Sequence, residues 1–224
     1  MPPRFYFGAI SPYSWFAAER IGELIPDAQW RPVFAGGLFR SVGRITWGVT
    51  PQREERIADC ERRAVEHGLG PIRWPQGWPR NDVLPARAML AADRCGGLIP
   101  FGLAAMRACF REGRDITQPE QLVAVAATVG MDGPRLLEQT QQPEIKDALR
   151  VVNDEAVAAG VIGVPSVVVD GDVFWGDDRL GEAARRCRRR SGPRLEESTT
   201  LDGPRGSEED PRISRRPERS DAST

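Results

Sequence analysis

The sequence predicts an α/β fold in which strands near the two ends of the ordered chain enclose a long helical middle. Three observations carry this prediction. A strand–helix–strand pattern occupies residues 4–35, helical spacing of apolar residues continues through most of the middle, and β-branched residues return as a hairpin near residue 170. The predicted order is therefore βαβ, an all-helical insertion, then ββα.

The opening is a strand–loop–helix–strand unit. Arg4–Phe7 contains the bulky aromatic residues typical of strands, and the chain breaks at Gly8. Apolar residues at helical spacing predict a helix over Ser14–Ile25, and Gln29–Phe34 is predicted to form the second strand. Such a unit requires a right-handed crossover and parallel pairing, which makes the opening thioredoxin-like.

The middle of the chain is expected to be helical after an irregular start. Ala35–Thr50 predicts a loop or a short turn of helix, and Pro51–His67 an amphipathic helix. Four prolines in Gly70–Pro85 exclude regular structure there and indicate a binding surface or an anchored cover. Further helices are expected at Ala86–Arg94, Pro100–Glu112, Pro119–Val129, Pro134–Gln141 and Pro143–Ala159.

The strand signal returns in a hairpin. Ser166–Val169 and Val173–Trp175 are β-rich runs joined by an Asp-Gly-Asp turn. An amphipathic helix follows from Leu180 to about Arg189, with Asp177 or Asp178 as its N-cap.

These patterns divide the chain into three parts. Residues 4–35 and 160–190 form the predicted thioredoxin-like domain, and residues 36–159 form the helical insertion. Residues 191–224 contain few apolar side chains and are expected to be a disordered tail of mixed charge.

Composition limits the classes of partner. The net charge of −1 provides no basic surface for nucleic acid and no polybasic anchor for a membrane. The start of the sequence has no apolar targeting segment, and no apolar run has membrane-spanning length, so we expect a cytoplasmic protein.

The cysteines predict neither a metal site nor a disulfide framework. Cys60, Cys95, Cys109 and Cys187 are far apart in sequence, and His67 is the only histidine. We expect reduced, structural thiols. We also expect His67 to be a surface residue at a helix end.

The loop before the first helix is the main candidate site. Thioredoxin-like proteins place a Cys-x-x-Cys pair here, but this sequence has Ser11-Pro12-Tyr13-Ser14 and cannot run a dithiol–disulfide cycle by itself. A hydroxyl beside a helix N-terminus could hold the thiolate of another molecule. Alternatively, Ser11 or Ser14 only caps the helix.

Two motifs together carry a family resemblance. The segment Phe5-Tyr-Phe-Gly-Ala-Ile-Ser-Pro-Tyr-Ser14 lies near the start, and Gly163-Val-Pro-Ser-Val-Val-Val-Asp-Gly-Asp-Val-Phe-Trp-Gly-Asp-Asp-Arg179 lies near the end. In this order and at this separation, they resemble the 2-hydroxychromene-2-carboxylate isomerases and the related kappa-class glutathione transferases, within the DsbA-like thioredoxin fold. The resemblance covers about residues 4 to 190.

The resemblance implies a thiol site. Ser11 matches the catalytic serine that hydrogen-bonds the glutathione sulfur and favours its thiolate. Pro165 matches the family's cis-proline, beside which the backbone of Val164 would pair with the cysteinyl part of glutathione. A trans proline that opens a strand is the alternative.

The second motif implies the site for the γ-glutamyl group. Gly176, Asp177, Asp178 and Arg179 match the segment that binds it. The helix N-terminus would receive the carboxylate, and Asp178 would face the ammonium. An acidic helix cap is compatible with the same residues.

The insertion departs from the family pattern. Its members place an Asn or Lys near the start of the first long insertion helix to bind the glycyl end, and here Arg53 could take that place as a cation. In the proline-rich loop, Asn81 is the expected substrate contact and Arg80 could bind an acidic substrate.

The resemblance implies glutathione, or another low-molecular-weight thiol, as a cofactor in the isomerisation of a conjugated, hydroxylated aromatic acid during aromatic catabolism. A transferase or peroxidase on the same scaffold, and a cysteine-less thioredoxin-fold protein that binds a peptide at the Pro165 groove, are the alternatives. A small-molecule substrate and a homodimer are expected from the family. No metal is expected.

Overall fold

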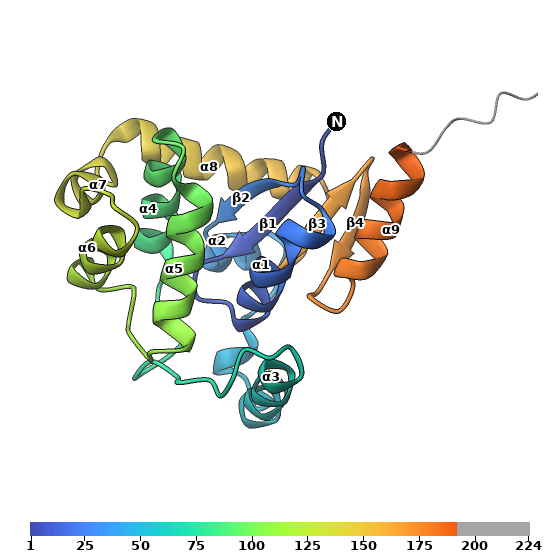
Figure 1. Cartoon of the computed structure of the whole chain (residues 1–224), viewed down its shortest axis with the longest axis horizontal. Coiled ribbons are helices and arrows are strands. Elements are labelled where there is room, and N and C mark those ends of the chain that lie inside the picture. Colours follow the sequence, from blue (N-terminus) through green and yellow to red (C-terminus); the bar gives the residue numbers. More distant parts are fainter. Residues whose placement is uncertain (192–224) are drawn as a thin grey trace, which may run out of the picture. The chain divides into compact units, whose positions relative to one another are not determined.

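Four short strands form one mixed sheet in the order β2–β1–β3–β4 (Figure 1). The computed structural model describes residues 1–191, so the predicted tail after Ser191 lies outside the described residues. Strand β1 pairs parallel to β2 and antiparallel to β3, and β3 pairs antiparallel to β4. The strands are β1 (Arg4–Gly8), β2 (Gln29–Val33), β3 (Ser166–Val169) and β4 (Asp172–Trp175).

Helices cover both faces of this sheet. In Figure 1, α1 lies in front of the strands with α9 beside it, whereas α2 and α8 lie behind. The α-helices are α1 (Pro12–Leu24), α2 (Ala35–Ser41), α3 (Arg53–Glu66), α4 (Val83–Arg94), α5 (Leu98–Phe110), α6 (Pro119–Thr128), α7 (Gly133–Gln139), α8 (Pro143–Ala158) and α9 (Leu180–Ser191), with a 3₁₀ turn, η1 (Trp47–Val49). The predicted βαβ…ββα order with a helical middle is confirmed.

Aromatic residues fill the space between the sheet and the helices in front of it. Phe5 and Phe7 point to the same face because side chains alternate along a strand. Their ring centroids are 5.2 Å apart, and Trp30 of β2 packs against both at 5.1 and 5.2 Å. The aromatic run that predicted the first strand therefore forms the core of the fold.

Several helices begin earlier than the sequence predicted. Helix α1 begins at Pro12 rather than Ser14, and α4 and α5 begin before Pro85 and Pro100. The first turn of a helix leaves its N–H groups without intrahelical partners, so a proline there removes no hydrogen bond. The prolines mark the first turns of these helices rather than their limits.

Helix α2 is longer than the short turn of helix that the sequence predicts as an alternative to a loop. Two glycines weaken the helical signal of this segment. The ring of Phe34 lies against them, and a Cβ on Gly37 would be only 2.6 Å from Phe34 Cδ1. The N–H of Ala35, in the first turn, donates to Asp82 Oδ2 at 3.2 Å. Contacts made only in the folded chain thus stabilise this helix.

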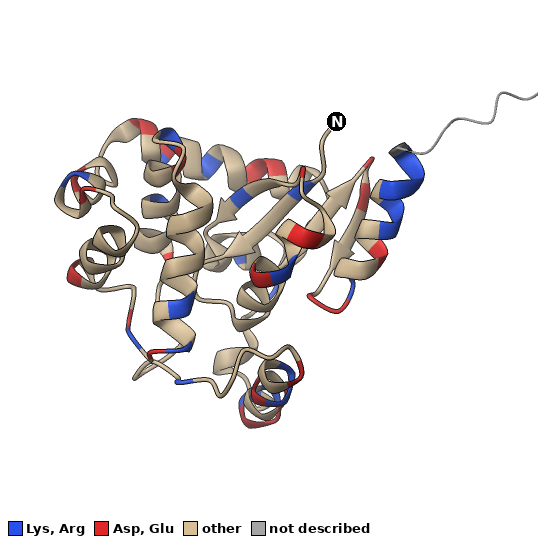
Figure 2. Ribbon diagram, in the orientation of Figure 1, with Lys and Arg blue, Asp and Glu red and all other residues tan. Residues whose placement is uncertain are grey.

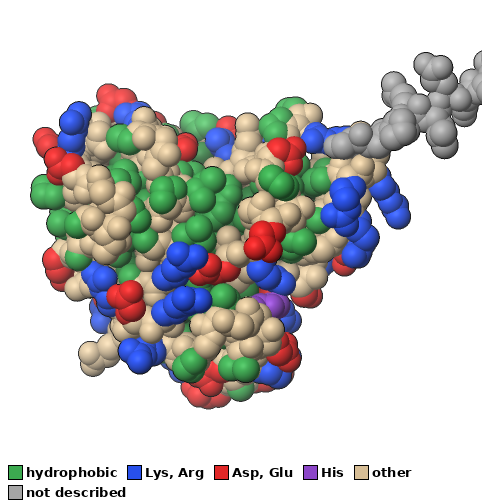
Figure 3. Space-filling model, in the orientation of Figure 1, with side chains coloured by type: hydrophobic (Ala, Val, Ile, Leu, Met, Phe, Trp, Pro, Cys, Tyr) green, Lys and Arg blue, Asp and Glu red, His purple; other side chains and the backbone are tan. Residues whose placement is uncertain are grey.

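Charged side chains are mixed over the described surface. Figure 2 shows basic residues gathered along α9, where Arg186 pairs with Asp172 of β4 at 2.9 Å. On the face in Figure 3, acidic and basic groups alternate over α3. None of the helices within residues 1–191 is both long and apolar enough to cross a bilayer.

Asn153 of α8 holds the junction between β2 and α2. Its Oδ1 accepts the N–H of Phe34 at 3.0 Å, and its Nδ2 donates to the Phe34 carbonyl at 2.9 Å. Asn153→Ala should lower the free energy of unfolding by about 2 kcal/mol, because the Phe34 N–H loses its partner and the Phe34 carbonyl keeps only the bond from Leu38. Chemical denaturation measures this, with exposed Asp154→Ala as the control. Equal stability of the two variants would contradict the role of Asn153.

Candidate active site

Ser11 lies where β1 ends and α1 begins. It is the N-cap of α1, and its Oγ accepts the N–H of Ser14 at 3.2 Å. The hydroxyl of Ser14 is fully buried and accepts the N–H of Gly8 at 3.2 Å. Ser11 is partly exposed, and its O–H donates to no acceptor within residues 1–191. The two serines therefore differ: Ser14 closes the loop, and Ser11 keeps a donor for a ligand.

The loop before Pro165 lies next to Ser11. A Cβ on Gly8 would be 3.2 Å from both Ala35 Cβ and Val164 Cγ2, and 3.7 Å from Ser11 Cβ. This close approach requires glycine at the end of β1. The Val164–Pro165 peptide bond is cis, as predicted. In the part of the chain that the structure describes, the backbone N–H and C=O of Val164 make no backbone hydrogen bond.

A cleft of about 610 Å³ opens at this edge of the sheet. This volume is within the range of small-molecule sites. Eight of the sequence-predicted residues line it: Ser11, Arg80, Asn81, Val164, Pro165, Gly176, Asp177 and Asp178.

Two predicted residues do not line the cleft. Arg53 pairs with Glu54 and donates to the Trp78 carbonyl at 3.4 Å, while Arg179 pairs with Glu182 and lies over the ring of Phe174. Arg53 is the first residue of α3 and is not among the lining residues, and its role at the glycyl end of the thiol stays a prediction. Arg56, which follows on α3, lines the cleft instead.

Asp177 is the centre of a buried ion-pair cluster. Only 2% of its surface is exposed. Its Oδ1 accepts from Arg63 Nη1 at 2.8 Å, and its Oδ2 lies 3.3 Å from His67 Nε2 and 3.5 Å from Arg20 Nη2. Arg20 also donates to the Asp177 carbonyl at 2.7 Å. The carboxylate thereby ties the segment before α9 to α1 and α3.

The cluster adds a contact to the expectation for His67. The residue lies at the end of α3 as predicted, but its ring packs on Phe16 at 5.7 Å and it is only partly exposed. Asp177 shows no sign in the sequence of being so deeply buried, because the arginines that surround it come from distant positions.

Asp178 differs from its neighbour. It is exposed, lines the cleft and forms no ion pair with any residue described. Gly176 has a φ of +114°, and a Cβ there would collide with Asp178 Oδ1. The carboxylate of Asp178 thus folds back over Gly176 and remains available to a cation.

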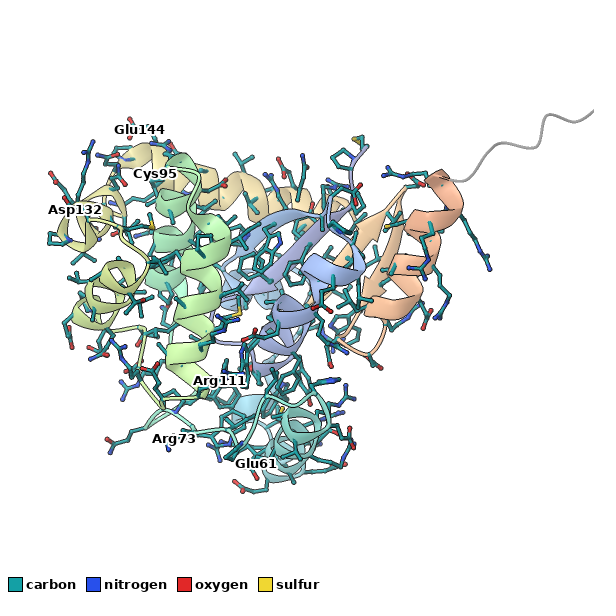
Figure 4. All side chains as sticks on the ribbon, in the orientation of Figure 1. Glu61, Arg73, Cys95, Arg111, Asp132 and Glu144 are labelled. Carbon is teal, nitrogen blue, oxygen red and sulfur yellow. The ribbon has the colours of Figure 1, made fainter. Side chains whose placement is uncertain are left out.

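The proline-rich loop is an anchored cover that also lines the cleft. Trp78 is buried and donates from Nε1 to the Ile10 carbonyl at 2.9 Å. Trp74 packs on Trp78 at 4.7 Å and donates to Glu61 of α3 at 2.9 Å; Glu61 is labelled in Figure 4. These contacts hold the following residues, Arg80 and Asn81, at the cleft.

Asp82 is a further lining residue that the sequence did not reveal. It is 3% exposed, and its carboxylate accepts the N–H of Ala35. Burial raises the pKa of Asp82 to about 6, although hydrogen bonds from Ala35 and Gly36 oppose the shift. The carboxyl group thus titrates well above the usual range.

Tyr13, which is partly buried and lines the cleft, neighbours the buried Cys60. Tyr13 donates from its hydroxyl to Asp59 Oδ2 at 3.0 Å, and burial raises its pKa strongly. Burial also raises the pKa of the Cys60 thiol to about 12, so it is protonated at neutral pH. None of the cysteines, all within residues 1–191, forms a disulfide, and Cys95 lies exposed where α4 ends (Figure 4).

Sequence reasoning also missed four arginines and two tryptophans of the cleft. Their spacing gives only a weak signal: Arg56 and Arg63, seven residues apart, share one side of α3. The missed residues are Arg40, Arg44, Arg56, Arg63, Trp47 and Trp175.

Within residues 1–191, no cluster of His, Cys, Asp and Glu suitable for a metal ion is present.

Comparison with known proteins places this site in a family. The DSBA-like thioredoxin domain family matches residues 4–187. The chain belongs to this family. The described fold, with its cis-proline opposite the start of α1, agrees with that membership.

Two curated relatives and one solved structure are similar to this family member. A 2-hydroxychromene-2-carboxylate isomerase of Sphingobium xenophagum is 29% identical over 190 residues, covering 79% of this chain and 92% of the relative. A glutathione S-transferase kappa 2 of Caenorhabditis elegans is 24% identical over 200 residues, covering 81% and 89%. A solved 2-hydroxychromene-2-carboxylate isomerase superposes with a TM-score of 0.69 at 19% identity, covering 85% and 98%.

The ion-pair cluster predicts unequal roles for two neighbouring carboxylates. Asp177→Ala should lower the free energy of unfolding by about 3 kcal/mol, because it leaves Arg20 and Arg63 without their buried counter-charge. The exposed Asp178→Ala should change it by less than about 0.5 kcal/mol. Urea denaturation of both variants tests this difference, and similar losses would contradict it.

The raised pKa of Asp82 predicts a pH-dependent stability. Between pH 4 and 6 the folded state retains a proton that the unfolded state releases, so this residue's contribution to stability falls as pH rises. A shift from 3.8 to about 6 corresponds to about 3 kcal/mol.

Asp82→Asn removes this titration, and its side chain can still accept from Ala35. The free energy of unfolding of the variant, relative to that of the parent protein, should therefore increase by up to about 3 kcal/mol as the pH rises from 4 to 8. Denaturation at the two pH values measures the change. A constant difference would show that Asp82 titrates in its usual range.

Proposed function

We propose that this protein uses glutathione, or another low-molecular-weight thiol, to isomerise a conjugated aromatic acid resembling 2-hydroxychromene-2-carboxylate. The observation that carries the proposal is the unused O–H donor of Ser11 at the N-terminus of α1, beside the unpaired backbone of Val164. The relatives named as an isomerase and a glutathione transferase support the same chemistry.

The cleft has groups that fit each part of the thiol. The N–H and C=O of Val164 can pair with the cysteinyl backbone as an added strand does. The exposed carboxylate of Asp178 can bind the γ-glutamyl ammonium, with the N-terminus of α9 for the carboxylate. Arg56 can bind the glycyl carboxylate, because it lines the cleft without a carboxylate partner among the described residues.

Ser11 controls the protonation of the sulfur. Its hydroxyl can donate to a thiolate, and the positive end of α1 favours the negative charge. Both effects lower the pKa of a bound thiol. The bound thiol supplies a nucleophile that adds to the conjugated double bond and leaves again after rotation, without net oxidation.

The remaining residues position the second ligand. Asn81 lines the cleft, and its Oδ1 accepts the N–H of Val83 at 3.0 Å, which leaves its amide N–H₂ group for a substrate oxygen. Arg80 pairs with Asp115 at 3.1 Å, so its charge is already balanced. The buried ion-pair cluster around Asp177 positions Asp178 rather than contacting the reacting atoms.

A kappa-class-like transferase would use the same thiol site and differs in the fate of the sulfur. An isomerase returns the thiol, so catalytic amounts suffice, whereas a transferase consumes one thiol per product. Measuring glutathione consumption during turnover of 2-hydroxychromene-2-carboxylate separates the two activities.

Calorimetry with glutathione tests the thiol site. Asp178→Ala and Arg56→Ala should each weaken binding about tenfold, since each loses a charge-assisted contact of about 1.4 kcal/mol. Ser11→Ala should still bind glutathione, but the ultraviolet absorbance of the bound thiolate should disappear at neutral pH.

Arg53→Ala is the matched control for Arg56→Ala, because it removes the same charge from the same helix outside the cleft. It should bind glutathione as the parent protein does. If the parent protein does not bind glutathione, and other small thiols also fail, the thiol-dependent function is wrong and the peptide-binding alternative gains support.

A further inference from the structure

Five arginines line the cleft, and they differ in whether protein carboxylates balance them. Arg63 pairs with Asp59 and Asp177, and Arg80 pairs with Asp115. The other three have no carboxylate partner among residues 1–191. With Arg56 assigned to the thiol, Arg40 and Arg44 remain as unbalanced cations in the cleft.

Local structure holds Arg44 in place. Gly43 follows the end of α2 with a φ of +67°, and its N–H donates to the Arg40 carbonyl at 3.3 Å. The N–H of Arg44 donates to the Phe39 carbonyl at 2.7 Å. These two bonds form a Schellman motif, which glycine favours and which turns the chain back after the helix.

The turn places the guanidinium of Arg44 over the indole of Trp175. Its Cζ lies 4.7 Å from the ring centroid. Trp175 is itself fixed, because its indole lies so close to Gly163 that a Cβ there would be 2.6 Å from Nε1. The cation–π contact orients the guanidinium but uses none of its N–H donors as hydrogen bonds. No acceptor for them is found within the described chain.

The strand register places the Arg44–Trp175 pair and the proposed γ-glutamyl site on different faces of the sheet. Arg31, Tyr6, Ser166 and Trp175 are successive cross-strand partners and therefore share one face of the sheet. Arg31 pairs with Glu155 of α8, so this is the face covered by α8 and α2.

Phe174 faces the other side, where Arg179, the residue before α9, covers its ring. Asp178 is next to Arg179 in the same short segment before α9. Arg44 and Asp178 thus approach the cleft from opposite faces of the sheet.

We propose that Arg40 and Arg44, together with Trp175, bind the second ligand of the cleft and make an aromatic carboxylate a requirement for it. The proposal rests on the proposed function and adds the residues that select the substrate. A pre-oriented guanidinium with free donors suits a carboxylate, and Arg40 adds a second charge from the face of α2 that lines the cleft.

Aromatic side chains beside these arginines suit the ring of such an acid. Trp175 is 40% exposed, an unusual fraction for a large aromatic residue, and Phe39 and Trp47 also line the cleft. Planar rings pack favourably in offset or edge-to-face contact with such groups. The carboxylate would therefore be held at Arg44 while the ring lies against aromatic neighbours.

Titration with an acid and its uncharged ester tests the proposal. The probes are trans-2-hydroxycinnamate and its methyl ester, and quenching of tryptophan fluorescence reports binding in the absence of glutathione. The acid should bind at least tenfold more tightly than the ester. Arg44→Ala and Arg40→Ala should each remove most of that difference while leaving the affinity for the ester and for glutathione unchanged.

Matched variants define the outcomes. Arg94→Ala, an equal loss of charge at the exposed end of α4, should behave as the parent protein does, and Arg44→Lys should retain only part of the preference for the acid. Equal binding of acid and ester by the parent protein would overturn the proposal. A loss of glutathione affinity in Arg44→Ala as large as the loss for the acid would also overturn it, because the arginine would then serve the thiol.

The design separates this proposal from the proposed function. If glutathione fails to bind but the preference for the acid persists and depends on Arg44, the carboxylate site stands and the thiol assignment fails. If glutathione binds but acid and ester are equivalent, the reverse holds.

Discussion

The buried carboxylate of Asp177 is the interaction on which the geometry of the site depends. It joins one loop to two helices through Arg20, Arg63 and His67, which approach from distant parts of the sequence. A buried charge requires such compensation, because an unpaired one would be strongly destabilising. Once the cluster forms, Gly176 and Asp178 have fixed positions at the cleft opposite the start of α1.

Two kinds of polar group lie side by side at the edge of the sheet where the cleft opens. Some are buried and bonded to other protein groups, and others are available to contact a ligand. Ser14, Asp177 and Asp82 are buried and satisfied by protein partners. Ser11, Asp178 and the unbalanced arginines lie beside them with donors or charges that no described residue uses. The scaffold thus presents the hydroxyl of Ser11 at the start of α1, where a Cys-x-x-Cys pair would supply thiols.

Some elements of the fold can be predicted from local sequence pattern, whereas others depend on tertiary contacts. The aromatic run Arg4–Phe7 and the β-branched hairpin are strong signals, and all three strands formed where expected. The sequence left helix α2 open as a loop or a short turn because its glycines lower intrinsic helix propensity, while Phe34, Asp82 and Asn153 restore stability from outside the segment. No window of sequence contains those compensations.

By itself the sequence determined the order of elements, the absence of a Cys-x-x-Cys pair and the two motifs that contain Ser11 and Pro165, because each of these depends on short-range spacing. Only the tertiary structure decided that Arg56 rather than Arg53 lines the cleft, that His67 is partly buried, and that Arg44 lies over Trp175. Each of these depends on which side of an element meets another element. That choice is made by packing across more than a hundred residues, which sequence periodicity does not encode.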